Sequence, residues 1–330
     1  MFLLGRANWF GFYRTFDLLY LIYNPAIELI PRNIPARSSI WSELELTKKE
    51  EVVIELPEAV ALAEQINKYL TGKIVRSTQA AHSPHKFTWY HGDPAEYPAK
   101  LNGNQMLSAR GVGMFVEITL SQSMLLFNDG VNLRLHPNAG PLPAKHQLLV
   151  TFEDETSFSA SVAMYGGVVC WERLATYDNT YYETALRKPS PLSNSFDESY
   201  FLELLAPEAL RKLPLKAALA TEQRIPGLGN GCLQDILWTA ELHPRRKLNT
   251  LTEAEISRLF GSVKDTLKAM TDGGGRSTEK DLLGQPGGYQ VRLSAETKGT
   301  PCPRCGTEIV KEAYMGGSIY TCPDCQRVYC

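Results

Sequence analysis

The sequence has no long apolar run and little net charge, and both absences narrow the range of functions. No stretch of about 18 residues is both apolar and uncharged, so no transmembrane helix is predicted. The formal net charge is −2, so overall charge gives no support to nucleic-acid binding, which must rest on local features. No internal repeat is evident, which argues against a repeat protein. The 330 residues, 44% of them hydrophobic, predict an ordinary globular protein of two or three domains.

Four of the seven cysteines form two pairs near the C-terminus, namely Cys302 with Cys305 and Cys322 with Cys325. Two residues separate the cysteines within each pair, and sixteen residues separate the pairs. This spacing predicts one closed tetrahedral zinc site per chain, with a structural role. Two disulfides are the alternative, although nothing else in the sequence is typical of a secreted protein.

Residues 1–52 differ in character from the rest of the chain. A signal peptide fits poorly because charged residues interrupt the apolar segment, and an amphipathic membrane anchor is an alternative. We expect instead a mis-annotated N-terminal extension or a disordered segment. In a bacterial gene, Lys48–Glu51 can be encoded by a ribosome-binding sequence and Val53 by an alternative start codon. The protein would then begin with methionine at position 53, followed by Ile54.

Patterns along the remainder predict a β-rich part followed by a helical part. Residues 56–70 predict a helix, because Pro57 lies in its first turn and Gly72 follows its end. Short β-rich runs between residues 73 and 171 predict an antiparallel sandwich. Helices are expected from Tyr200 to Met270, the first of them over residues 200–213.

The turn Gly227–Asn230 lies between two of those predicted helices. Two glycines permit a tight turn, and Asn230 lies where the next helix begins. The free backbone N–H groups of a helix start predict a seat for a phosphate group. A simply capped turn is the alternative for this segment considered alone.

Three motifs, in this order, resemble the formamidopyrimidine-DNA glycosylase/endonuclease VIII family. They are the helix start Glu55-Leu-Pro-Glu-Ala, the turn Gly227–Asn230 with the downstream Leu242-His-Pro, and the finger ending Cys322-Pro-Asp-Cys325. The resemblance covers Ile54 to the C-terminus. It implies an α+β fold with an N-terminal β-sandwich and flanking helices, a helix–two-turn–helix domain, and a C-terminal zinc-finger hairpin. The expected domains are a sandwich at 53–186, a hinge at 187–199, a DNA-binding helical domain at 200–296 and a finger at 297–330.

The resemblance also implies roles for single residues. Glu55 matches the glutamate that assists as proton donor, and Ile54 takes the place of the proline whose N-terminal amine attacks the sugar. Asn230 matches an asparagine that contacts phosphate. Tyr165 stands at the position of an aromatic wedge, and Arg110 lies in the hairpin that contacts DNA.

The chain departs from the family pattern at several positions, so it resembles a divergent branch that lacks the N-terminal proline. No lysine occurs between Leu101 and Ala144, where the family has a catalytic hairpin lysine. Met164 replaces the arginine before the aromatic wedge, and Gly317 stands near the position of the finger arginine. These changes remove groups that take part in the family's lyase step.

The resemblance therefore implies a DNA glycosylase of base excision repair that binds damaged or abasic duplex DNA. Hydrolysis with Glu55 activating water is a variant of this activity. A catalytically inactive lesion- or structure-specific DNA-binding protein is the alternative, and binding of RNA or of a protein partner ranks last. We expect a monomer in the bacterial cytoplasm, near the nucleoid, with no membrane and no nucleotide cofactor.

Overall fold

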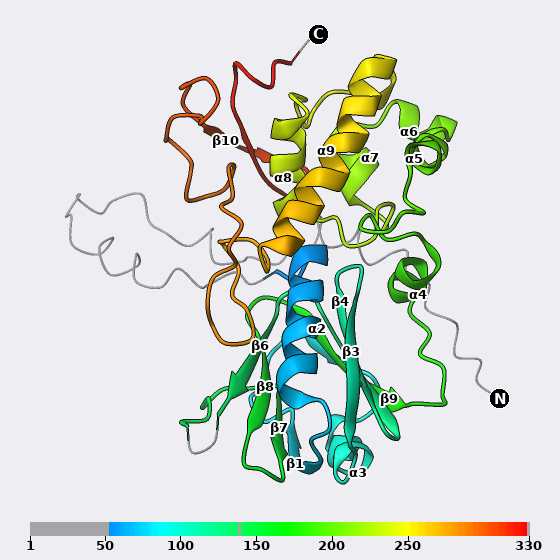
Figure 1. The fold of residues 1–330 in the computed structure, drawn as a ribbon, viewed down its shortest axis with the longest axis vertical. Helices are drawn as coiled ribbons and strands as arrows, with labels where there is room; N and C mark the ends of the chain where they lie inside the picture. Colours follow the sequence, from blue (N-terminus) through cyan, green and yellow to red (C-terminus); the bar gives the residue numbers. More distant parts are fainter. Residues whose placement is uncertain (1–52, 138–139, 329–330) are drawn as a thin grey trace, which may run out of the picture. The chain divides into compact units, whose positions relative to one another are not determined.

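The computed structural model describes residues 53–137 and 140–328, so the expected N-terminal extension at 1–52 lies outside the described residues. The helices are α2 (Leu56–Leu70), α3 (Tyr97–Leu101), α4 (Thr180–Arg187), α5 (Glu198–Leu205), α6 (Glu208–Arg211), α7 (Leu215–Ala220), α8 (Asn230–Thr239) and α9 (Glu253–Asp272), with short 3-10 helices η3 (Pro94–Glu96) and η4 (Leu248–Thr250). The strands are β1 (Val75–Ala80), β2 (Thr88–Tyr90), β3 (Met106–Val112), β4 (Phe115–Leu120), β5 (Ser123–Asn128), β6 (Val131–His136), β7 (Leu148–Phe152), β8 (Ser157–Val162), β9 (Gly166–Glu172), β10 (Val310–Tyr314) and β11 (Gly317–Thr321). Figure 1 shows these elements along the chain.

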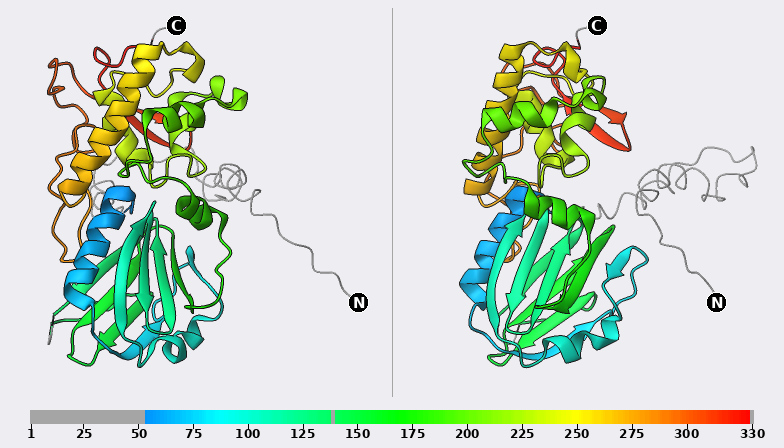
Figure 2. Two further views of the ribbon diagram at one scale, coloured as in Figure 1. Left: turned by 45° about the vertical axis from the view of Figure 1, so that its right-hand side comes forward. Right: turned by 90° about the vertical axis from the view of Figure 1, so that its right-hand side faces the viewer.

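Two sheets form the predicted sandwich in the first half of the described chain. One sheet has the strand order β2-β9-β5-β4-β3 and the other β1-β7-β8-β6. All pairs are antiparallel except β2 with β9, which is parallel. Phe127 of one sheet contacts Phe158 of the other edge to face, with 5.7 Å between ring centroids, and both are buried. The prediction of an α+β fold with a sandwich is confirmed, and Figure 2 shows the sheets as layers.

Helix α2 has the predicted bounds and lies along β3 (Figure 1). It begins with Pro57 in its first turn, and a capping box joins Glu55 to the backbone and side chain of Glu58. A Cβ atom added to Gly111 of β3 would lie 2.8 Å from the backbone nitrogen of Val60, so a glycine is needed where strand and helix approach. This close approach therefore fixes the first turns of α2 against the sandwich.

The helical domain has its own core, formed by α2, α5 to α9 and the turns between them. The predicted helix over residues 200–213 is wrong as a single element, since α5 ends at Leu205 and α6 begins at Glu208. Pro207 explains the break, because proline lacks an N–H donor and restricts the residue before it. Over the described ranges, no helix is both long and apolar enough to cross a membrane.

The C-terminal hairpin strands β10 and β11 follow a loop that is fastened to α8. The carboxylate of Asp235 accepts hydrogen bonds from the backbone N–H groups of Arg292 and Leu293, each at 2.9 Å. The side-chain oxygen of Gln234 accepts one from the N–H of Tyr320 at 3.1 Å. Helix α8 therefore supports the finger as well as the turn that precedes the helix.

Candidate functional site

The carboxylate of Glu55 caps the start of α8. It accepts hydrogen bonds from the backbone N–H groups of Gly229 at 3.0 Å, Gly231 at 2.7 Å and Cys232 at 2.9 Å. Glu55 is only 2% exposed, and a guanidinium nitrogen of Arg276 lies 3.4 Å from Oε1. A carboxylate at a helix N-terminus satisfies otherwise unpaired donors and interacts favourably with the helix dipole. Both oxygens of Glu55 are therefore engaged within the protein.

The prediction that the backbone N–H groups of this helix start are free to hold a phosphate group is wrong for a physical reason, whereas the phosphate contact expected of Asn230 stays a prediction. Three N–H groups of the first turn of α8 already donate to Glu55, which comes from a segment more than 170 residues away in the sequence. A phosphate group at the same place would have to displace a buried carboxylate. Asn230 does begin the helix as expected, and it is exposed.

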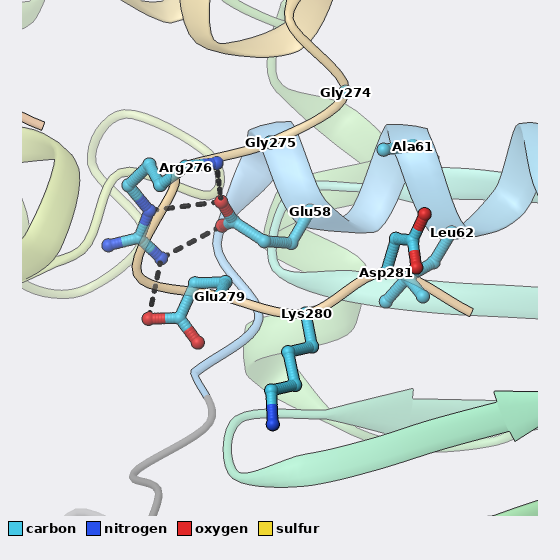
Figure 3. Close-up of a pocket in the computed structure, with 9 residues that line it drawn as sticks. All are labelled: Glu58, Ala61, Leu62, Gly274, Gly275, Arg276, Glu279, Lys280 and Asp281. Atoms are coloured by element: carbon cyan, nitrogen blue, oxygen red, sulfur yellow. Dashed lines mark hydrogen bonds and ion pairs between the residues drawn. The ribbon is translucent and has the colours of Figure 1, made fainter. Parts of the chain in front are cut away.

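Arg276 brings together the acidic groups around Glu55. Its Nε and Nη2 donate to the two carboxylate oxygens of Glu58 at 3.0 and 2.8 Å, and its backbone N–H donates to the same carboxylate at 3.0 Å (Figure 3). Glu58 also accepts from the N–H of Glu55 at 3.1 Å. Burial opposes the charge on Arg276, but attraction by Glu55 and Glu58 outweighs it and raises the pKa of Arg276 well above its ordinary value. The guanidinium therefore stays charged in a site that is 3% exposed.

A third carboxyl group, Glu279, lies in the same cluster and contacts the chain just before Ile54. Its Oε2 accepts a hydrogen bond from the N–H of Val53 at 2.9 Å, and Arg276 Nη2 donates to the carbonyl of Val53 at 3.1 Å. Burial is the main cause that raises the pKa of Glu279 to about 7, and Glu55 and Glu58 add to the effect against the attraction of Arg276. Three buried carboxyl groups share one guanidinium, so the cluster has an excess of acidic groups beside the nitrogen of residue 53.

Ile54 is fixed against the sandwich. Its N–H donates to the carbonyl of Asp129 at 2.9 Å, and the residue is 1% exposed. In the 330-residue chain, this nitrogen belongs to a peptide bond and is not an amine. Asp129 follows β5, and burial raises the pKa of its carboxyl group to about 6. Asn128 donates to that carboxyl group at 2.7 Å.

Arg110 and Tyr165 differ in their contacts, since Arg110 is ion-paired and Tyr165 is an exposed ring in a turn. Arg110 donates to both oxygens of the buried Glu117, at 2.7 and 3.0 Å, and Tyr182 donates to the same carboxylate. Tyr165 is 44% exposed in the turn between β8 and β9, and its carbonyl accepts from Gly130 at 3.0 Å. This bond joins the turn of Tyr165 to the segment that holds Ile54, whereas Arg110 is engaged by its own sheet.

The four predicted metal-ligating cysteines come together in the finger, with their sulfur atoms all within 4.8 Å of one another. Three of the separations are 3.9 Å for Cys302 to Cys325, 3.3 Å for Cys305 to Cys322 and 3.5 Å for Cys305 to Cys325. Zinc–sulfur bonds of about 2.3 Å in a tetrahedron require sulfur atoms roughly 3.8 Å apart, so the cluster fits a zinc ion. Disulfide sulfurs lie about 2.05 Å apart, so the disulfide alternative is wrong.

Arg276 and Glu279 were not identified from the sequence as site residues. They lie in the glycine-rich loop after α9, where no periodic pattern or known motif marks them. The one available signal was an arginine and a glutamate three residues apart, next to three consecutive glycines. That signal is too common to indicate a site without the fold.

Comparison with known proteins gives matches along most of the chain. The family profile described as the formamidopyrimidine-DNA glycosylase H2TH domain matches residues 188–281. A protein of Lactococcus lactis subsp. lactis (strain IL1403), named formamidopyrimidine-DNA glycosylase, is 30% identical over 281 residues, which cover 83% of this chain and 99% of that protein. The crystal structure of MutM (Fpg) from Thermus thermophilus is similar with a TM-score of 0.67 at 25% identity, covering 82% of this chain and 98% of that one. A structure of MutM in complex with DNA containing carbocyclic 8-oxo-G has a TM-score of 0.70 at 25% identity, covering 83% and 100%.

Replacing Glu279 by glutamine should change how stability depends on pH. The pKa of Glu279 is about 7 in the folded protein against an ordinary value of 4.5, so the folded state binds its proton more tightly. The stability that this group contributes is present below pH 4.5 and is lost as the pH rises to 7. Glu279→Gln removes that loss, so the free energy of unfolding of the variant should rise relative to the parent by on the order of 3 kcal/mol between pH 4.5 and 8. Denaturant unfolding at a series of pH values measures this difference, and a constant difference would contradict the assignment.

Replacing Gly231 by alanine should disrupt the buried cluster. The added Cβ would lie 1.6 Å from Arg276 Nη1 and 2.8 Å from Glu55 Oε1. We expect a loss of about 3 kcal/mol or more in the free energy of unfolding, because a buried charge loses its partner. Gly261, in the middle of α9, is the matched control, since a Cβ there meets nothing within 4 Å. Gly261→Ala should stabilise the protein by up to about 1 kcal/mol, and equal effects at both positions would refute the packing argument.

Proposed function

Because this chain belongs to the formamidopyrimidine-DNA glycosylase family, we propose that it is a DNA glycosylase of base excision repair, which binds damaged duplex DNA and removes the damaged base. One similar structure is of MutM with DNA that contains carbocyclic 8-oxo-G, which makes an oxidised purine the first substrate to consider. The match extends over 99% of the Lactococcus protein, so no domain of that relative is missing here.

The observation that carries the proposal is the position of Glu55. It lies between Ile54 and the start of α8, so the residue with the catalytic role implied by the resemblance sits where the sandwich meets the helical domain. Both of its oxygens accept hydrogen bonds, so one of these bonds must open before Glu55 takes or gives a proton. The proposed catalytic pair is Glu55 and the amine of a chain that starts just before it, at residue 53 or 54.

The buried charges support one arrangement of the nucleophile. A lyase step needs an amine, because a peptide nitrogen cannot form an imine. In a protein that starts at residue 53, the α-ammonium group would lie beside Glu279 and would supply the positive charge that the acidic cluster is short of. In a protein that starts at Ile54, the amine would instead lie beside the carbonyl of Asp129. The start near residue 53 is part of this proposal.

The proposed DNA contacts come from three exposed groups. Asn230 would contact a phosphate group through its side chain, because the N–H groups of the helix start are engaged by Glu55. Tyr165 would act as the aromatic wedge. Arg110 would contact the backbone with the part of its guanidinium that Glu117 leaves free, since its side chain is 60% exposed. Duplex DNA would be bound by a single copy of the chain, in the nucleoid of a bacterial cell.

We propose that zinc is the metal of the finger. Cys302, Cys305, Cys322 and Cys325 are the ligands, and the donor set of four thiolates is typical of a structural zinc ion. The indole N–H of Trp238 in α8 lies 3.4 Å from the sulfur of Cys302, which would support that ligand from outside the metal site. When bound, the ion would stabilise the finger and take no part in the reaction.

Two observations favour a second candidate, a lesion-binding protein without catalysis. The nitrogen of Ile54 is engaged in a peptide bond, and the sequence has no lysine between residues 101 and 144. DNA recognition would survive both changes, because it depends on other groups. The two candidates differ in base release and not in binding.

A duplex with one 8-oxoguanine separates the candidates. We expect the protein to bind it at least tenfold more tightly than the undamaged duplex, a difference of about 1.4 kcal/mol, and to release the free base under single-turnover conditions. Fluorescence anisotropy measures the binding, and mass spectrometry of the released base measures the reaction. Tight binding without release, also on a panel of other oxidised bases, would support the lesion-binding candidate. Equal affinity for damaged and undamaged DNA across that panel would overturn both.

A further inference from the structure

Exposed aromatic side chains occur on two adjacent segments at the edge of the five-stranded sheet. Phe87, just before β2, is 45% exposed, and Tyr165, just before β9, is 44% exposed. The neighbouring Met164 is 36% exposed. Strand β2 pairs with the beginning of β9, so these residues are brought together by the sheet and not by the sequence. Core packing accounts for neither ring.

The backbone holds both rings in place. The N–H of Gly166 donates to the carbonyl of Phe87 at 3.1 Å, and the N–H of Gly130 donates to the carbonyl of Tyr165 at 3.0 Å. Both aromatic residues are therefore fastened at their own backbone, Phe87 to β9 and Tyr165 to the turn between β5 and β6. Their side chains are presented from a fixed sheet edge, which lowers the entropy lost when another ring packs on them.

Trp89 of β2 orders the ring of Tyr165. A Cβ atom on Gly167 would lie 2.5 Å from the indole Nε1 of Trp89, so the indole packs closely against the glycine backbone. The ring of Tyr165 is nearly parallel to that of Trp89, with an angle of 15° and 6.5 Å between centroids. Unlike Phe87 and Tyr165, Trp89 is half-buried and packs against the apolar cluster next to α4. Trp89 thus has a structural role, whereas the other two rings face solvent.

The patch formed by Phe87, Met164 and Tyr165 is continuous with the segment that holds Ile54. The N–H of Ile54 donates to Asp129, the next residue Gly130 donates to Tyr165, and Gly166 donates to Phe87. Three backbone hydrogen bonds thus connect the proposed reaction centre to the exposed rings. A positive charge is also present, since the ammonium group of Lys86 lies 5.3 Å from the centre of the Phe87 ring.

We propose that Phe87 and Tyr165, with Lys86, form a stacking site for an unpaired nucleobase of the bound DNA. This inference rests on the proposed function and adds to it a residue, Phe87, that stacks on the unpaired base. Bases stack on aromatic side chains, and a neighbouring cation favours the phosphate of the same nucleotide. Phe87 is the new element, because Tyr165 already had an expected role as a wedge.

The test compares two duplexes that differ only in one base. One carries a single extrahelical adenine, and the other carries an abasic residue at the same position. Because the protein is also expected to bind abasic duplexes, the readout is the ratio of the affinity for the duplex with the base to the affinity for the abasic duplex. Stacking is worth about 1–3 kcal/mol per base, so Phe87→Ala should lower this ratio by about 5-fold or more relative to the parent, and Phe87→Tyr should retain the parent's ratio. Fluorescence anisotropy with both duplexes gives the ratio directly.

Leu174→Ala is the matched control. Leu174 follows the opposite end of β9 and is 99% exposed, so its replacement removes an exposed apolar side chain away from the patch. This variant should keep the affinity ratio of the parent. An unchanged ratio in Phe87→Ala would overturn the proposal. A parent that binds neither duplex would instead count against DNA binding itself. Thermal unfolding of each variant shows that the fold is kept.

Discussion

The rest of the site depends on one interaction, the capping of α8 by the carboxylate of Glu55. Three backbone N–H groups of the helix start converge on a side chain that precedes α2 and is fixed by the sandwich through Ile54. A helix that begins inside a protein needs acceptors for these groups, and here they come from the other domain. Gly229 and Gly231 permit the approach, because a side chain at either position would collide with Glu55 or Arg276. The turn before α8 and the segment at Ile54 are thereby held together.

The buried cluster around Arg276 contains more charged groups than the stability of the fold requires. Replacing buried ion pairs by apolar residues is often neutral or stabilising, so three carboxyl groups and one guanidinium are not explained by stability alone. The excess of acidic groups raises the pKa of Glu279 to about 7, and Glu279 contacts the nitrogen of residue 53. A cluster short of one positive charge is suited to receive an amine at that position. The buried charges of this cluster therefore favour the amine that the proposed lyase step of this protein needs.

The sequence predicted the features whose signals are local. Helix α2 and the cysteine cluster follow from spacing over a few residues, and both have the predicted positions. The cap of α8 could not be predicted, because its acceptor, Glu55, lies far away in the sequence. The expectation of free N–H groups at that helix start was wrong for the same reason. Residue type alone could not show which of Phe87 and Trp89 is exposed either. Only the pairing of β2 with β9 shows that one ring is exposed and the other packs on Gly167.

Amide hydrogen exchange tests most directly whether Glu55 joins the two domains. The N–H groups of Gly229, Gly231 and Cys232 should exchange slowly in the parent, because they are bonded to a buried carboxylate. In Glu55→Gln, an amide replaces one acceptor oxygen, so these N–H groups should exchange at least about tenfold faster, while those in the middle of α9 keep their rates. Unchanged exchange at all three positions would show that Glu55 does not cap α8, and the account of the site would then be wrong.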